Sequence, residues 1–167
     1  MDLTHPIEID LLEFVASGRF DFIKLGQTKE WILANFLDPD GFGPEMLRPR
    51  WAIWTYDRLE FHFDTDNRLT TIYTDYLAEL PHNNRVQITP WIFRHADQLT
   101  LRYVLEALNQ HGIDYEKQSG PLGVGLHLRS GLRLSFTPFD EFVAAEPNEF
   151  KLTALCLAKQ SVYRWSG

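Results

Sequence analysis

This sequence contains almost no cysteine and no long apolar run. Cys156 is the only cysteine, which excludes an internal disulfide and a zinc site made of several cysteines. No stretch approaches the roughly 18 apolar residues of a membrane-spanning helix, so we expect no membrane segment. The N-terminal stretch MDLTHPIEID lacks an apolar run behind a basic start, so no signal peptide is expected and the cytoplasm is the expected location.

Basic residues are also few. Lys and Arg together number 16 and Asp and Glu 23, which gives a formal net charge of −7. Nucleic-acid binding depends on Lys and Arg side chains that neutralise phosphates, so this balance predicts no nucleic-acid partner. An acidic chain of this kind is compatible with a basic protein partner.

Signatures of catalysis and of metal or cofactor binding are missing as well. The sequence has no His-Glu-x-x-His and no Gly-x-Ser-x-Gly, and no two of its histidines are spaced i, i+4 on a predicted helix. The glycine-rich stretch at 120–125 precedes a predicted strand, whereas a phosphate-binding loop leads into a helix. Cys156 lies in an apolar stretch, which disfavours a reactive thiolate. We therefore predict no catalytic residue, no metal ligand and no cofactor.

Aromatic residues, in contrast, are plentiful at 14% of the chain. The apolar share of 44% and the charged share of 23% are ordinary for a globular protein. A length of 167 residues is close to the usual size of one domain, so we expect a single domain over residues 1–167.

The first half predicts two helices followed by three strands. Residues 4–17 place their apolar side chains on one helical stripe, with Thr4 as the N-cap and Gly18 as the stop. A second helix begins at Thr28 and ends before Pro39, because the residue that precedes a proline avoids the helical conformation. The strands are expected at 51–57, 59–63 and 68–76.

The second half predicts one more helix and further strands. After a connector at 78–90 and an extended stretch at 89–93, either Asp97 or Thr100 opens the helix. Periodicity alone leaves 150–158 open between strand and helix. The other strands are expected at 113–117, 124–128 and 132–136. The expected fold is α+β, with an antiparallel sheet and helices on one face.

The two halves resemble each other in sequence. LEFHF at 59–63 and LRLSF at 132–136 lie 73 residues apart, and the candidate caps Thr28 and Thr100 lie 72 residues apart. Chance similarity between two common helix-and-hairpin patterns is the alternative explanation.

We interpret the similarity as an internal repeat. The units are residues 25–76 and 97–158, each with the order α-β-β-β, and this favours a strand for 150–158. One helix on three strands is too small to be stable alone, so each unit needs the other to complete its core.

The stretches LGQTKEWILANFLDPD and YDRLEFHFDTDNRL combine a helix, a glycine and proline turn, and an antiparallel meander. Occurring twice, this pattern resembles the architecture of the beta-lactamase inhibitory protein, and the small outer-membrane assembly lipoproteins share a single copy of it. The likeness covers 25–76 best and 97–136 loosely. The sequence lacks the signal peptide and the lipid-attachment or disulfide cysteines of those families. The resemblance implies a non-catalytic, protein-binding role.

Three residues with metal-ligand side chains, Glu60, His62 and Asp64, alternate along one face of a predicted strand. On a straight strand they spread over about 13 Å, so they cannot all bind one metal ion. A strand face exposed to solvent is the simpler interpretation.

The stretch WAIWTY places Trp51 on one face of its strand and Trp54 and Tyr56 on the other. A one-residue slip of register exchanges the faces, so the sequence leaves open which face enters the core. An uncovered tryptophan beside acidic residues would form a protein-binding face. The candidate binding residues are therefore Trp51, Trp54, Tyr56, Glu60, His62 and Asp64.

Two functions are compatible with these patterns. The first is a non-enzymatic, intracellular protein-binding module of the inhibitor or immunity type, whose partner is a basic protein or a second copy of the chain. The alternative is a small-ligand-binding or metal-dependent enzymatic domain with a cleft between the repeats, which would use Glu60, His62 and neighbouring aromatic side chains.

Overall fold

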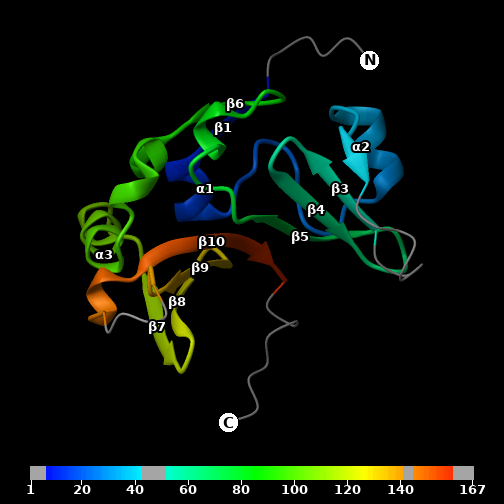
Figure 1. The fold of residues 1–167 in the computed structure, drawn as a ribbon. Coiled ribbons are helices and arrows are strands. Elements are labelled where there is room, and N and C mark those ends of the chain that lie inside the picture. The colour runs from blue at the N-terminus through cyan, green and yellow to red at the C-terminus, as the bar shows by residue number, and fades with distance from the viewer. Residues whose placement is uncertain (1–6, 43–51, 141–144, 160–167) are drawn as a thin grey trace.

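A computed structural model describes residues 7–42, 52–140 and 145–159 of the chain. Its main feature is an eight-stranded antiparallel sheet with the strand order β2-β3-β4-β5-β10-β9-β8-β7 (Figure 1). The first four strands are Gly41–Phe42 (β2), Ala52–Tyr56 (β3), Leu59–Phe63 (β4) and Leu69–Thr74 (β5). The others are Tyr115–Gly120 (β7), Gly123–Leu128 (β8), Leu132–Thr137 (β9) and Lys151–Ala158 (β10).

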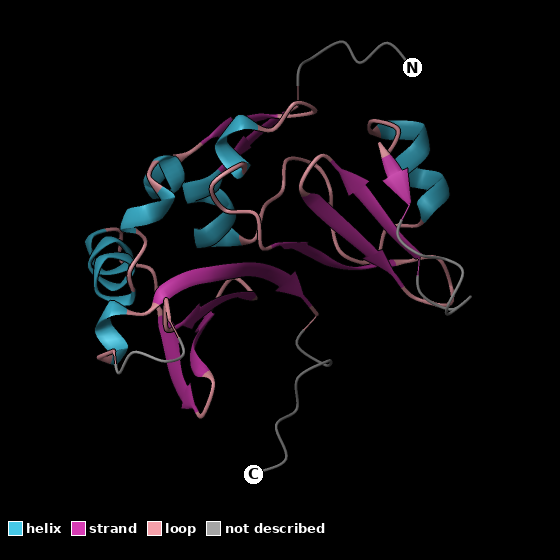
Figure 2. Ribbon diagram, in the orientation of Figure 1, coloured by secondary structure: helices cyan, strands magenta, loops and turns pink. Residues whose placement is uncertain are grey.

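The helices pack on one face of this sheet, so the predicted α+β fold is confirmed (Figure 2). The α-helices are Leu11–Ser17 (α1), Lys29–Asn35 (α2) and Leu101–Gln110 (α3). Short 3₁₀ helices occur at Leu80–His82 (η1), Trp91–Arg94 (η2), Ala96–Gln98 (η3) and Pro147–Glu149 (η4). Within the described part of the chain, no helix has the length and apolar composition needed to cross a membrane.

The N-terminal region differs from the predicted helix over 4–17. Glu8–Asp10 forms a short strand, β1, which pairs in parallel with Gln87–Thr89, β6. Ile9 is buried between two exposed neighbours, which is the alternation of a strand. The helix begins only at Leu11, because Asp10 caps it by accepting hydrogen bonds from the amides of Leu12 and Glu13. The predicted cap Thr4 lies outside the described residues.

The stretch at 89–93 is extended only at Thr89, the last residue of β6, and turns helical from Pro90, contrary to the expectation. Pro90 has a helical backbone conformation and starts the 3₁₀ helix η2, with the amide of Phe93 donating to the carbonyl of Pro90 at 2.9 Å. This turn buries the Phe93 side chain in the core, and the core contact outweighs the extended preference of the sequence.

Each half of the sheet carries one helix in the same way. Thr28 caps α2 and Thr100 caps α3, each accepting an amide hydrogen bond at 3.2 Å. The residues beside each cap also form backbone hydrogen bonds with residues at the start of a central strand, which is β5 in the first half and β10 in the second. Around Thr28 the bonds are Leu69 N to Gln27 O and Lys29 N to Asn67 O, and around Thr100 they are Leu152 N to Leu99 O and Leu101 N to Phe150 O.

Strands β5 and β10 lie side by side at the centre and join the halves. Tyr73 lies opposite Cys156, with Thr74 opposite Leu155 and Ile72 opposite Leu157 on either side. Residues 150–158, left open by periodicity, therefore contain a strand. Its antiparallel pairing to β5 makes the sheet continuous across both halves.

An aromatic cluster forms the core of the first half. Tyr56, Phe61 and Phe36 are in ring contact, with centroids 4.7 to 5.9 Å apart. Tyr56 is 1% exposed, and its hydroxyl has no hydrogen-bond partner among the described residues. Burial raises the pKa of Tyr56 well above its ordinary value. The hydroxyl therefore stays protonated and contributes little to stability.

Removing either threonine cap should destabilise the fold. We expect Thr28→Ala and Thr100→Ala each to lower the free energy of unfolding by about 1 kcal/mol, because each leaves a helix amide without its partner. The double variant should lose about 2 kcal/mol, since the caps share no contact. Urea unfolding measures the loss, and Thr→Ser at the same positions is the control. Unchanged midpoints in both single variants would contradict the capping role.

The Tyr56 hydroxyl should be dispensable. We expect Tyr56→Phe to preserve stability or raise it by about 1 kcal/mol, because the change removes a buried polar group without a partner. Tyr56→Ala, which also removes the ring, should cost about 3–5 kcal/mol. Thermal unfolding of both variants checks this, and a clear loss in Tyr56→Phe would mean that the hydroxyl is hydrogen-bonded in solution.

Candidate functional site

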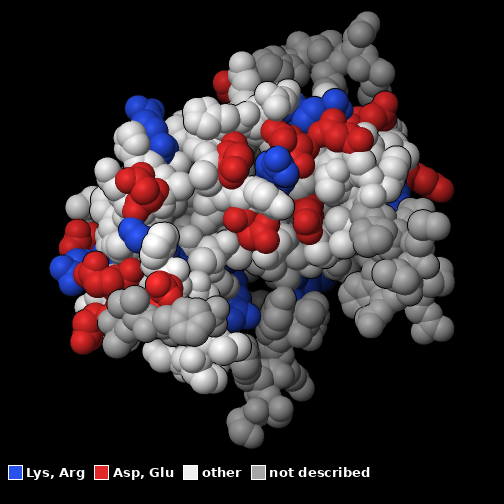
Figure 3. Space-filling view, in the orientation of Figure 1, with Lys and Arg blue, Asp and Glu red and all other residues white. Residues whose placement is uncertain are grey.

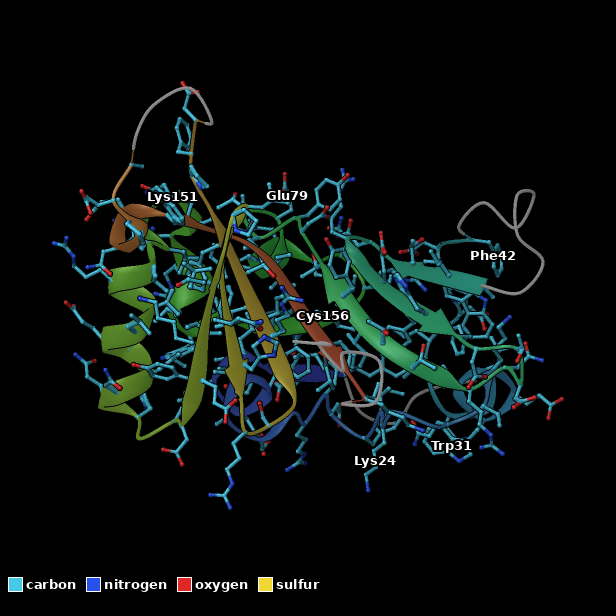
Figure 4. The ribbon with its side chains drawn as sticks, turned by 90° about the horizontal axis from the view of Figure 1, so that it is seen from below. Lys24, Trp31, Phe42, Glu79, Lys151 and Cys156 are labelled. Atoms are coloured by element: carbon cyan, nitrogen blue, oxygen red, sulfur yellow. The ribbon has the colours of Figure 1, made fainter. Side chains whose placement is uncertain are left out.

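The candidate site is the face of the sheet opposite the helices, which we call the open face. Figure 4 shows it from below, with the strands in front of α1 and α2 and with Cys156 near the middle. No helix or strand of the described residues covers this face. Its side chains are those that alternate with the buried residues of each strand.

The structure separates the predicted binding residues. Trp54 and Tyr56 are 5% and 1% exposed and belong to the core, so they cannot form the exposed binding face that the sequence suggested. Glu60 and His62 lie on the open face, with Glu60 Oε2 2.7 Å from His62 Nε2. Trp51 lies outside the described residues.

Asp64, the last of the predicted set, has a structural role in the β4–β5 turn. Its Oδ1 accepts hydrogen bonds from the amides of Asp66 and Arg68 at 3.0 and 2.9 Å. The structure therefore brings only Glu60 and His62 together, and this pair agrees with the alternation predicted for residues 59–63.

The β3–β4 turn decides which aromatic residues enter the core. Asp57 and Arg58 form a two-residue loop, in which Asp57 has a positive φ of 55°. This loop sets Trp54 opposite Phe61. Because residues opposite each other point to the same face, Trp54 follows Phe61 into the core.

One row of side chains crosses the open face. Glu60 lies opposite Tyr73, and Tyr73 lies opposite Cys156, so the row passes from the first half to the second. In sheet order from β3 to β7, this cross-strand row consists of Thr55, Glu60, Tyr73, Cys156, Arg133, His127 and Glu116. Opposite residues in neighbouring strands have Cβ atoms about 5 Å apart, so each member can contact the next.

The first-half end of the row is acidic and aromatic. Glu60 pairs with His62, whose ring centroid lies 6.1 Å from that of Tyr73. Burial raises the pKa of Tyr73, and the nearby Asp75 and Glu60 carboxylates raise it further. Tyr73 is therefore a neutral, half-buried aromatic group at the centre of the open face.

The second half of the row contains Arg133 and His127, with the acidic Glu116 at its end. A Cβ built on Gly125 would lie 3.4 Å from Nε of Arg133 and 3.6 Å from Nε2 of His127, so the missing side chain leaves room for both groups. His127 Nε2 is buried and has no hydrogen-bond partner among the described residues. Burial lowers the pKa of His127 and the Arg133 charge lowers it further, so the ring is neutral near pH 7.

A pocket of about 300 Å³ opens beside these residues. The pocket lies along β7, β8, β9 and the end of β10. Its polar lining residues are Glu116, Gln118, His127, Arg133, Cys156 and Lys159.

Cys156 is placed for packing more than for reaction. It is half-buried, and burial raises the pKa of its thiol, while the Arg133 charge opposes that rise. A thiol with a raised pKa is protonated at neutral pH and is a weak nucleophile. Arg133 separates Cys156 from His127 in the row, and no three His, Cys, Asp or Glu side chains of the described residues are grouped as a metal site.

The sequence analysis did not predict most members of the row, although the alternation of apolar and polar residues in the strands indicates them. LRLSF alternates Leu with Arg133 and Ser135, which marks Arg133 as outward-facing. The three-residue loop 129–131 then sets Arg133 opposite His127. Only the pairing of β5 with β10, which joins segments distant in the sequence, had no local signal.

The Cys156 thiol should react slowly in the folded protein. We expect a thiol reagent such as DTNB to react more slowly with the folded chain than with the urea-unfolded chain, and the rate to rise steadily as pH increases, because only the thiolate attacks. Arg133→Gln should slow the reaction further, since the variant removes the charge that favours the thiolate. Lys24→Gln is the matched control for loss of a distant charge. Equal rates in folded and unfolded protein at pH 7 would contradict this environment.

No protein-family model matches this chain, and comparisons with curated proteins and with solved structures give no match. The resemblance to the beta-lactamase inhibitory protein remains a prediction from the sequence pattern.

Proposed function

We propose that this chain is a protein-binding module without catalytic activity, and that its open face contacts the partner. The observation that carries the proposal is the cross-strand row, which runs from β3 to β7 on the face that no described element covers. The row offers an aromatic group, both signs of charge and several hydrogen-bonding groups. This mixture is typical of protein interfaces, in which Tyr and Arg are enriched.

A comparison of the two halves supports both the internal repeat and the location of the function. The helix caps, the bonds beside them and the strand registers correspond pair by pair. Corresponding core positions are apolar in both halves, as in Trp54 and Leu126, Phe61 and Leu134, and Ile72 and Leu155.

Corresponding positions on the open face differ in chemistry. Glu60 in the first half corresponds to Arg133 in the second, and Thr55 corresponds to His127. Packing requires similar residues in both cores, whereas no packing requirement accounts for the different outward residues. We infer that binding determines the residues of the open face.

The charges of the row suggest the chemistry of the partner. Glu60 places a carboxylate in the first half of the row and Arg133 places a guanidinium in the second, so a partner that carries both signs of charge would complement the row. Figure 3 shows the molecule at right angles to the view of Figure 4, and the side seen there carries acidic groups with basic groups among them.

A small-ligand-binding function is the second candidate. The pocket of about 300 Å³ favours it, because that volume is at the lower limit of small-molecule sites. A soluble ligand would occupy the second half alone and would leave Glu60 and Tyr73 without a role, so we rank it below a protein partner.

Site-specific photo-crosslinking tests the proposal. A photoreactive residue at Thr55, on the open face, should give one protein adduct in lysate of the native host, and the same residue at Glu106, exposed on α3, should not. With the captured protein purified, Tyr73→Ala should weaken binding at least about tenfold, because a central tyrosine is a common hot spot.

The control for this effect is Tyr73→Phe, which keeps the ring and should retain most of the affinity. Unfolding midpoints of both variants exclude a folding defect. Identical adducts from Thr55 and Glu106, or an adduct of two copies of this chain alone, would contradict a distinct partner on the open face.

A further inference from the structure

We propose that the protein partner binds by adding an extended segment, as an antiparallel strand, to the exposed edge of the sheet at β7. The segment carries an acidic residue opposite Lys117, a basic residue opposite Glu116 and an aromatic residue opposite Gly120. The inference rests on the proposed function for the existence of a partner, whereas the open edge and the chemistry that fits it follow from β7 itself.

Strand β7 is the outermost strand of the second half, so one side of its backbone faces no other strand (Figure 1). It pairs with β8 without a bulge from Tyr115 to Gly120, and every residue after Tyr115 is exposed. No hydrogen bond links residues 116–120 to a described residue outside β8. Alternate residues of an edge strand direct their N–H and C=O groups away from the sheet, so this edge offers donors and acceptors in the pattern that another strand matches.

The two ends of the sheet differ in how far they permit further pairing. Strand β2, at the other end, has only two residues, and a very short edge strand is one way in which proteins prevent the addition of another chain. Strand β7 has six residues and contains neither a proline nor a bulge. A long and regular edge is the feature that strand addition uses, because main-chain hydrogen bonds then supply affinity and side chains supply selectivity.

The two charged residues of β7 define the charges of the added segment. Glu116 and Lys117 are exposed, and neither forms an ion pair with a described residue. Opposite side chains of neighbouring antiparallel strands have Cβ atoms about 5 Å apart, so an acidic residue opposite Lys117 and a basic residue opposite Glu116 would each form a cross-strand pair. The basic residue would extend the cross-strand row, which ends at Glu116.

Gly120 provides space for a large side chain on the same face. Gln118 and Gly120 alternate with Glu116, so they lie on the open face. A Cβ built on Gly120 would have only the carbonyl oxygen of Gly123 within reach, at 4.0 Å. A pocket of about 510 Å³ lies there, and Leu122, which is 84% exposed, is among its lining residues. An aromatic side chain opposite an edge glycine covers the missing side chain, which favours an aromatic residue at this position of the segment.

A second copy of the chain fits this edge less well. Two identical antiparallel strands pair about a two-fold axis, so the pairing centres on one residue. Centring it on Glu116 or Lys117 sets two like charges opposite each other, which is destabilising. Centring it on Gln118 leaves both charges without an opposite charge. We therefore assign the edge to a different chain.

The probe is the blocked peptide acetyl-Thr-Phe-Thr-Thr-Glu-Lys-Val-Thr-amide, titrated into the ¹⁵N-labelled full chain and followed by NMR. In antiparallel register its Phe lies opposite Gly120, its Glu opposite Lys117 and its Lys opposite Glu116. We expect saturable shifts of the β7 amide signals, with a dissociation constant on the order of 1 mM. Hydrogen exchange of the outward β7 amides should slow, because they become hydrogen-bonded.

Matched peptides and a variant separate strand addition from nonspecific adhesion. Exchanging the Glu and Lys of the peptide should weaken binding at least about threefold, since both cross-strand pairs become like-charge pairs. The double variant Glu116→Lys, Lys117→Glu should reverse this preference. Both residues are exposed, so the variant should fold normally, which circular dichroism checks.

Two further peptides carry N-methyl groups on alternate residues. In one the methyl groups point toward β7, and in the other they point to solvent. Only the first should lose binding, because N-methylation removes the amide donors that the edge would bond.

Equal binding of the two N-methylated peptides, equal binding of both charge orders, shifts at β2 instead of β7, or no shift at all would overturn the inference. A dimer of the free chain through β7, detected by sedimentation, would assign the edge to a second copy and would also overturn it. If the peptide adds to β7 and open-face cross-linking finds no partner, the proposed function fails and the strand-accepting edge stands. If cross-linking identifies a partner and no peptide adds to β7, the function stands and this inference fails.

Discussion

The pairing of β5 with β10 is the constraint on which the rest of the structure depends. Each half builds a helix-covered set of strands, and in isolation each would end in an unpaired strand edge. Tyr73 opposite Cys156 sets the register that joins these edges, and the pairs on either side are related by a local two-fold symmetry. The joined sheet lets both helices and the N-terminal segment cover one continuous core.

This register also creates the open face. Side chains alternate between the two faces of a strand, so once the core residues are fixed, every residue between them points outward. Because the strands are aligned across the sheet, outward residues fall into rows, and the row through Tyr73 and Cys156 includes a titratable group in each of its strands from β4 to β7. The position of the row therefore follows from core packing, whereas the identity of its side chains does not.

Local patterns predicted most of the elements and none of the long-range pairings. The alternation in 59–63 and 132–136 was sufficient for β4 and β9, and threonine caps marked the starts of α2 and α3. The burial of Trp54 was not predictable, because it depends on a register set by the turn at Asp57. The N-terminal segment was misassigned because its few apolar residues fit both periods, and the pairing of β1 with β6 decides between them.

The difference between the two halves would constrain how the proposed partner binds. If both halves presented the same outward groups, a partner could bind in two orientations related by the local two-fold axis. Glu60 and Arg133 occupy corresponding positions and carry opposite charges, so rotation by half a turn would place like charges together. Like-charge contacts in a partly buried interface disfavour the wrong orientation. Under the proposed function, the symmetric sheet would supply a wide platform, and its asymmetric surface charges would select one orientation of the partner on it.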